Sequence, residues 1–323
     1  MPGIAISNLP PSSMCNRPAI YRHASMAVMQ PCLKCEVRRP LPVFVTFHSR
    51  PTAYLWLMIR ALALSLLLVS PVMAESVGQS DVVEGAFRPG WKTASGTHMT
   101  ALHLVLAPQW KTYWRAPGEA GIPPQFDWTG SENVGSVRFH WPAPDVFETN
   151  GLITVGYHDE LVLPFEVTPK DPKKPVSLQA EIDLGVCKDI CVPASLSLSV
   201  VLPAPGQSDS AINAALKARP SSAGEAGLRS ITCKLEPIRD GMRITAQMDL
   251  PAQGKDEVVV FELAEAGVWV SESQVRRTGG TLKAMAELVP PSGQPFALNR
   301  SAVLVTVIGS NARAVEIRGC PAG

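Results

Sequence analysis

The sequence is poor in aromatic and in charged residues, which make up only 6% and 18% of its 323 positions. No stretch with the period of a helix dominates the chain, whereas 30 prolines and 24 glycines interrupt it throughout. Proline and glycine are unfavourable inside helices, and their frequency here favours many short strands joined by turns. We therefore expect an all-β protein built from sandwiches or barrels, with room for about two domains.

The motifs of several large enzyme classes are missing. The chain contains no G-x-S-x-G elbow, no H-E-x-x-H helix and no glycine-rich phosphate loop, so a hydrolase or a transferase finds no support. After residue 74 it holds 22 Lys and Arg against 27 Asp and Glu, a formal charge of −5. A mildly acidic chain gives no electrostatic reason to bind nucleic acid, and we expect no such partner.

Residues 58–74 have the architecture of a secretory signal peptide. A basic start at Arg60 precedes the apolar core 61–69, and small residues lead up to Glu75. The alternative is a retained membrane anchor, but the apolar run reaches barely the roughly 20 residues of a span and is interrupted by a charge and a proline. We expect cleavage after Ala74 and export to the periplasm.

Residues 1–57 show neither periodicity nor a folded composition. We expect them to be a non-structural leader or the product of a mis-called start, with translation beginning at Met58. The pair Cys32 and Cys35 lies in this stretch. A lone C-x-x-C without a second pair is weak evidence for metal or redox chemistry.

Residues 81–203 read as one domain with strands at 97–107, 134–141, 161–167, 176–184 and 194–202. Apolar residues alternate with polar ones in 178–184 and again in 196–200, which is the period of half-buried strands. Proline and glycine clusters separate the runs. An immunoglobulin-like β-sandwich fits this pattern best.

Residues 204–227 form a linker rich in Pro, Gly and Ser, with a short helix expected at 209–219 and Ser208 or Asp209 as its N-cap. Residues 228–323 are again strand-rich, and we expect a second β-sandwich there. Its strands are predicted at 242–250, 258–263, 268–273, 282–288, 302–308 and 314–318.

Four cysteines follow residue 74, an even number that an oxidising compartment allows: Cys187, Cys191, Cys233 and Cys320. Three pairings are possible. Cys187 and Cys191 stand between two alternating runs that read as a hairpin. On a helix their Cβ atoms would lie about 5–6 Å apart, too far for a disulfide, whereas a hairpin turn brings them within reach. A local disulfide is therefore expected.

Loop length separates the two expected bridges. Closing about five residues stabilises a protein by roughly 2 kcal/mol, and closing the 88 residues from Cys233 to Cys320 by about 4–5 kcal/mol. Cys233–Cys320 is therefore predicted to be structural. A small ring at an exposed loop tip is easily reduced, so thiol–disulfide exchange is the hypothesis for Cys187 and Cys191. Lys188 would favour a thiolate there and Asp189 would oppose it.

Two other uses of the small ring remain open. In the first, the ring is an inert clip of the hairpin. In the second, its thiols bind copper or zinc together with His140 or His158, which could approach only through tertiary folding. We expect no metal and no cofactor.

Four stretches in order carry a family resemblance: Trp110 to Arg115 (WKTYWR), Trp141 to Glu148 (WPAPDVFE), Gly156 to Pro164 (GYHDELVLP) and the cysteine hairpin. With them, residues 87–203 resemble the N-terminal periplasmic domain of the DsbD family of thiol:disulfide interchange proteins. The likeness is closest to the ScsB-like branch, which is linked to copper tolerance.

The resemblance implies an immunoglobulin-like sandwich whose redox disulfide joins two strands at one end. It implies that Cys191 forms the mixed disulfide with a partner and that Cys187 is its redox mate. It further implies that Phe147 caps the disulfide, with Asp145 in the same loop, and that Tyr113 lines this end of the domain. The cysteine spacing is shorter than in the best-known members.

In this family the domain takes electrons from a membrane-embedded domain and passes them to oxidised periplasmic proteins. The sequence shows neither that domain nor a thioredoxin-like one, so the reductant is expected on a separate membrane chain. Acceptors in cytochrome c biogenesis, disulfide isomerisation or copper resistance all fit. The function expected is therefore a periplasmic thiol–disulfide interchange protein, an oxidoreductase-type shuttle. The alternative is an exported binding module, for partner docking or copper handling, with structural disulfides only.

Overall fold

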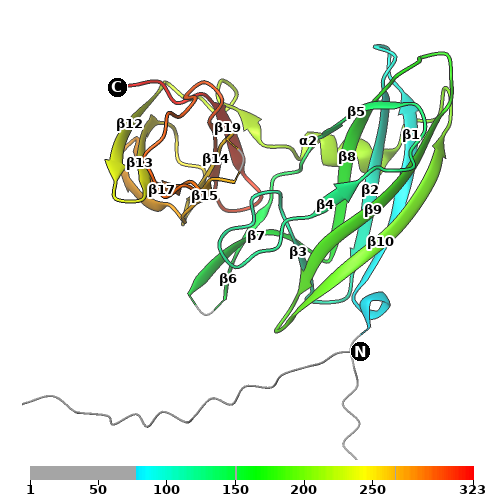
Figure 1. The fold of residues 1–323 in the computed structure, drawn as a ribbon, viewed down its shortest axis with the longest axis horizontal. Helices are drawn as coiled ribbons and strands as arrows, with labels where there is room; N and C mark the ends of the chain where they lie inside the picture. Colours follow the sequence, from blue (N-terminus) through cyan, green and yellow to red (C-terminus); the bar gives the residue numbers. More distant parts are fainter. Residues whose placement is uncertain (1–77, 150, 266) are drawn as a thin grey trace, which may run out of the picture. The chain divides into compact units, whose positions relative to one another are not determined.

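Two β-sandwiches follow one another along the chain in the computed structural model, which describes residues 78–149, 151–265 and 267–323 (Figure 1). The predicted all-β class with an immunoglobulin-like sandwich is confirmed. The expected leader 1–57 and signal peptide 58–74 lie outside the described residues. None of the helices in the described part of the chain has the length and apolar character that a bilayer crossing requires.

The first sandwich consists of two antiparallel sheets. One has four strands in the order β1 (Val83–Lys92), β2 (His98–Leu106), β8 (Glu160–Pro169) and β5 (Val134–Phe139). The other has the order β10 (Cys191–Leu202), β9 (Val176–Cys187), β3 (Lys111–Tyr113), β7 (Leu152–His158) and β6 (Asp145–Thr149), with β4 (Gln125–Asp127) also paired to β9. A 3₁₀ turn, η1 (Gln79–Asp81), precedes β1.

The β9–β10 hairpin fixes which residues face outward. In β9 the alternate residues Leu178, Ala180, Ile182 and Leu184 are at most 3% exposed, and these are the residues whose alternation predicted the strand. The two strands pair at twelve consecutive positions. Because successive side chains of a strand point to opposite faces, the intervening residues of β9, Cys187 among them, lie on the outer face of the sheet.

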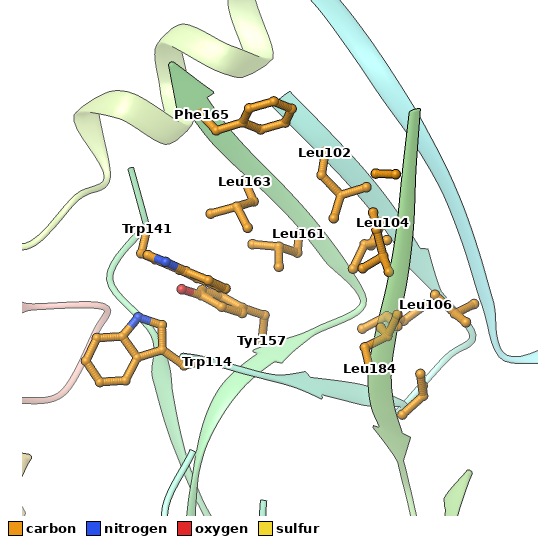
Figure 2. Close-up of a cluster of buried hydrophobic side chains, with 14 of the residues drawn as sticks. Leu102, Leu104, Leu106, Trp114, Trp141, Tyr157, Leu161, Leu163, Phe165 and Leu184 are labelled. Atoms are coloured by element: carbon orange, nitrogen blue, oxygen red, sulfur yellow. The ribbon is translucent and has the colours of Figure 1, made fainter. Parts of the chain in front are cut away.

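The core of this sandwich fills the space between its two sheets. Phe165, Leu102 and Leu163 from one sheet, and Trp114 directly after β3 of the other, are at most 1% exposed. Each such leucine or phenylalanine contributes about 1.5–3 kcal/mol by leaving water. Figure 2 shows these side chains converging with others of the same cluster: Leu104, Leu106, Trp141, Tyr157, Leu161 and Leu184.

A short helix, α2 (Ser210–Lys217), occupies the predicted linker, as expected from residues 209–219. Of the two candidate caps, Asp209 is the one used: its Oδ1 accepts hydrogen bonds from the backbone N–H groups of Ala211 (2.8 Å) and Ile212 (3.2 Å). Arg88 Nε donates to Asp209 Oδ2 at 2.9 Å. Ile212 is fully buried, which anchors the helix on the first sandwich through residues of β2.

The second sandwich also has two sheets. One has the order β11 (Ser221–Ser222), β19 (Ala314–Arg318), β18 (Leu304–Ile308) and β14 (Val258–Glu262), with β11 parallel to β19. The other has the order β12 (Ser230–Ile238), β13 (Gly241–Asp249), β17 (Thr281–Val289) and β15 (Trp269–Val270), with β16 (Gln274–Thr278) also paired to β17.

The strand predicted at 268–273 is only partly present. β15 ends at Val270, and β16 begins at Gln274 on the same partner strand, β17, with the pairing shifted by one residue. The residues between them form a bulge, in which Ser271 N–H still bonds to Glu287 O at 2.9 Å. Hydrophobic alternation does not reveal such an interruption, because a bulge adds a residue without changing composition.

Candidate functional site

The candidate site lies at the tip of the β9–β10 hairpin, where a disulfide joins Cys187 to Cys191. Cys187 ends β9 and Cys191 begins β10, and the two are paired directly across the hairpin with their Cα atoms 4.1 Å apart. The three intervening residues form the turn, closed by a hydrogen bond from Lys188 N–H to Ile190 O of 3.0 Å. The register of the whole hairpin therefore places the two sulfurs side by side.

The two cysteines differ sharply in exposure. Cys187 is only 2% exposed, whereas Cys191 is an exposed residue. Exchange begins when a thiolate from another molecule attacks one sulfur of a disulfide, and the sulfur attacked must be accessible. By this criterion Cys191 is the accessible residue of the pair and Cys187 the inaccessible one.

A buried tyrosine lies against the pair. Tyr113 of β3 is 2% exposed, and its Oη donates a hydrogen bond to Cys187 Sγ at 2.9 Å, with Cys191 Sγ at 3.6 Å. Burial raises the pKa of the Tyr113 phenol, which keeps it protonated as a donor at neutral pH. A hydroxyl donor held beside a sulfur would stabilise a thiolate at that sulfur.

A glycine makes room for this tyrosine. Gly185 lies two residues before Cys187 on the same face of β9. A Cβ atom at Gly185 would lie 3.2 Å from Tyr113 Cδ2 and 2.8 Å from Ile122 Cβ, so any larger residue would displace both side chains. The glycine therefore leaves the space that the Tyr113 ring and Ile122 occupy beside the disulfide.

The other two predicted site residues lie further along the same sheet face. Asp145 and Phe147 belong to β6, which is separated from β9 by β3 and β7. Cross-strand partners share a face, and the pairings Cys187–Lys111–His158 and Tyr113–Gly156–Asp145 connect these strands. The contacts of the Phe147 ring are with His158, whose ring centroid is 6.1 Å away, and with the Lys111 ammonium.

Asp145 belongs to a small charged group around a histidine. His158 Nε2 lies 3.5 Å from Asp145 Oδ2, and His158 Nδ1 lies 2.6 Å from Asp159 Oδ2. The hydrogen bond from His158 holds the pKa of Asp159 below its usual range. Both carboxylates are thus engaged by the imidazole.

Sequence reasoning missed Lys111. The register pairs it with Cys187 on one side and with His158 on the other, so its side chain shares the outer face with the disulfide. Lys111 Nζ donates to Thr154 Oγ1 at 3.1 Å and lies 4.9 Å from the centre of the Phe147 ring. Its position in the run WKTYWR, two residues before Tyr113, could have indicated that both side chains share a face. Because β3 has only three residues, its alternation is too short to show which face that is.

The second disulfide, Cys233–Cys320, lies in the core of the second sandwich. Both cysteines are 1% exposed. Cys233 lies in β12, and Cys320 lies two residues beyond the end of β19. Arg300 Nη1 donates to the carbonyls of Cys233 (2.8 Å) and Cys320 (3.3 Å).

Among residues 78–149, 151–265 and 267–323, no three His, Cys, Asp or Glu side chains are grouped so that they could hold a metal ion. His158 is held by its two carboxylates, and His140 lies beside Glu166, with its Nε2 3.5 Å from Glu166 Oε2. Neither histidine has a described contact with the cysteine pair.

Comparison with known proteins gives two matches. Residues 82–203 match the family described as thiol:disulfide interchange protein DsbD, N-terminal. Among solved structures, the N-terminal periplasmic domain of ScsB from Proteus mirabilis aligns with a TM-score of 0.56 and 22% sequence identity, over 75% of this chain and 92% of that one. This likeness shows the fold. No curated protein matches the chain.

Proposed function

Because residues 82–203 form an N-terminal domain of the DsbD family, a family of thiol:disulfide interchange proteins, we propose that this chain relays electrons through Cys187 and Cys191. The observation that carries the proposal is the asymmetry of the pair: an exposed Cys191 bonded to a buried Cys187 that accepts a hydrogen bond from Tyr113. A purely structural disulfide needs neither an exposed cysteine nor a hydrogen-bond donor beside its buried sulfur.

The first half of the cycle reduces the pair. A thiolate of a membrane-embedded dithiol, on a separate chain, attacks Cys191 Sγ; a mixed disulfide forms and Cys187 leaves as a thiolate. The second thiol of the donor then attacks the donor's own sulfur, which releases Cys191. Two electrons have entered the pair, and the donor is left as a disulfide.

The second half passes these electrons on. The Cys191 thiolate attacks a disulfide of an oxidised exported protein, and one acceptor sulfur leaves as a thiolate. Cys187 then attacks Cys191 Sγ, which closes the ring again and releases the acceptor as a dithiol. Tyr113 assists each time Cys187 carries negative charge, because its hydroxyl is fixed 2.9 Å from that sulfur.

We propose Phe147 and Asp145 as the cap region of this site. Support comes from the shared sheet face and from the contacts that place the Phe147 ring between Lys111 and His158. Asp145 holds His158 from the β6 side. A cap held by such surface contacts is released at little cost when a partner approaches.

We further propose that the relay operates in the periplasm, after removal of residues 58–74. The ScsB structure that resembles this chain is described as a periplasmic domain. An oxidising compartment is also where the Cys233–Cys320 disulfide would form and persist.

The test uses the second disulfide as an internal control. The whole chain is equilibrated in glutathione buffers of defined ratio, its free thiols are alkylated, and the labelled peptides are identified by mass spectrometry. We expect Cys187 and Cys191 to become labelled together while Cys233 and Cys320 stay protected. Labelling of neither Cys187 nor Cys191 while the chain remains folded would contradict exchange and favour a binding module with structural disulfides.

Two variants then assign the roles of the two cysteines. Cys191→Ala should abolish mixed-disulfide formation, since the accessible sulfur is gone. Cys187→Ala should instead accumulate the mixed disulfide at Cys191, because no neighbouring thiol remains to resolve it. The reverse result would assign the attacking role to Cys187.

A further inference from the structure

Lys111 occupies a position between the redox pair and the cap. Its backbone is paired with Cys187 in the β3–β9 ladder, so the two side chains start from the same face with Cβ atoms about 4.5–5.5 Å apart. With the disulfide closed, its ammonium group lies away from Cys187, on Thr154 Oγ1 and over the Phe147 ring. The flexible four-carbon stem of a lysine is long enough to turn back across the gap to Cys187.

Lys111 is the cation whose residue pairs directly with Cys187 on this face of the described sheet. On β7 and β6, His158 is engaged by Asp145 and Asp159. Tyr113 on β3 contributes a neutral hydroxyl. In the turn, Lys188 and Asp189 carry opposite charges on adjacent residues, and both are exposed to solvent.

We propose that Lys111 is a positioning residue that couples the redox state of Cys187 to the Phe147 cap. While the disulfide is closed, the ammonium group rests on the Phe147 ring; when reduction leaves Cys187 as a thiolate, the ammonium group turns to that anion and leaves the ring. This inference rests on the proposed function only in taking Cys187 as a sulfur that is reduced, by the dithiol donor described above.

Two physical arguments support the switch. A cation over an aromatic ring is worth about 0.5–1 kcal/mol at an exposed site, so the contact with Phe147 is readily exchanged for one with a thiolate. Partial burial also lowers the pKa of Lys111, because its ammonium group has lost part of its hydration. A neighbouring anion restores that lost stabilisation.

The first experiment measures the pKa of the Cys187 thiol. The whole chain with Cys191→Ser keeps Cys187 as the one thiol of the pair, and its thiolate absorbance near 240 nm is followed against pH. The chain with both Cys187→Ser and Cys191→Ser serves as the blank for all other thiols. A unit charge about 5 Å away shifts a pKa by about half a unit even in water, and by more in a protein.

Removing the charge should therefore raise this pKa. We expect Lys111→Met to raise it by about 0.5–1 unit and Lys111→Arg to raise it by less. Lys188→Met is the matched control, an exposed lysine next to Cys187 in sequence, and it should have the smaller effect. No change with Lys111→Met, or an equal change with Lys188→Met, would overturn the proposal.

The second experiment tests the coupling to the cap. Phe147→Leu removes the ring but keeps an apolar side chain, so Lys111 is freed and the pKa of the Cys187 thiol should fall. The fall should vanish when Lys111→Met is also present, because coupling between two sites is reciprocal. A fall that persists in the double variant would overturn the coupling.

These titrations need no exchange partner. A chain that fails to exchange with glutathione but shows the Lys111-dependent shift would contradict the proposed relay, and it would leave in place the charge coupling between Lys111 and the Cys187 thiolate. A chain that exchanges normally but shows no Lys111-dependent shift would support the relay and overturn this inference.

Discussion

The two disulfides of this molecule have opposite surroundings. Cys187 and Cys191 are four residues apart, at the tip of a hairpin, and one of them is exposed. Cys233 and Cys320 are 87 residues apart, and both are 1% exposed in a core. The first is accessible and constrains little chain, whereas the second is inaccessible and ties together the two ends of a sandwich.

This contrast shows that a disulfide's role follows from its surroundings. Stabilisation grows with the length of chain that is closed, because the bond acts mainly on the unfolded state. Reactivity depends on whether a thiolate can reach one sulfur and on how well the other sulfur leaves. Cys187–Cys191 has the features for exchange, and Cys233–Cys320 has those for stability.

The largest expected effect is the loss of the long-range bridge. The double variant Cys233→Ala with Cys320→Ala should lower the free energy of unfolding of the second sandwich by about 4–5 kcal/mol, since it frees the longer loop. Urea denaturation followed by circular dichroism measures this. A loss below about 1 kcal/mol would remove the basis for calling this bridge structural.

Removing the hairpin bridge should cost less. Cys187→Ala with Cys191→Ala frees a five-residue ring, for which the same reasoning gives at most about 2 kcal/mol. The register of twelve paired residues should persist, because buried alternate side chains of β9 hold it. Amide hydrogen exchange of β9 and β10 reports this; unfolding of the hairpin would show that the bridge is a clip after all.

The smallest expected change in stability comes from removing one atom, the Tyr113 hydroxyl oxygen that contacts the Cys187–Cys191 disulfide. Tyr113→Phe removes the hydroxyl bonded to Cys187 and should cost about 0.5–1.5 kcal/mol while slowing exchange with glutathione. Tyr157→Phe is the control: its buried hydroxyl donates to Pro142 O at 2.8 Å, away from the sulfurs. It should cost similar stability and leave the exchange rate unchanged. Equal slowing in both variants would assign the effect to packing alone.

Much of the fold was predictable because apolar and polar residues alternate along its longer strands. The predicted runs 176–184 and 194–202 correspond to β9 and β10, and 134–141 to β5. Shorter strands such as β3 and β4, three residues each, gave no usable pattern, because alternation cannot be recognised over so few residues.

The candidate site was predictable only in its local part. The spacing of Cys187 and Cys191 pointed to a hairpin, which the ladder of β9 and β10 bears out. The approach of Tyr113 and Lys111 depends on β3 lying beside β9, a pairing between segments over 70 residues apart. Family resemblance supplied Tyr113, but nothing in the sequence indicated that Lys111 is paired with Cys187.

The uninterrupted β9–β10 ladder has a consequence for how this protein tolerates change in evolution. Side chains of β9 alternate between the core face and the outer face of the sheet. Cys187 is on the outer face because it follows the core-facing Val186 by one residue. Deleting a single amino acid from β9 would shift the alternation by one residue, so that the Cys187 side chain would point into the core. Lineages descended from such a chain should therefore gain or lose residues in this hairpin only in pairs, or in its turn.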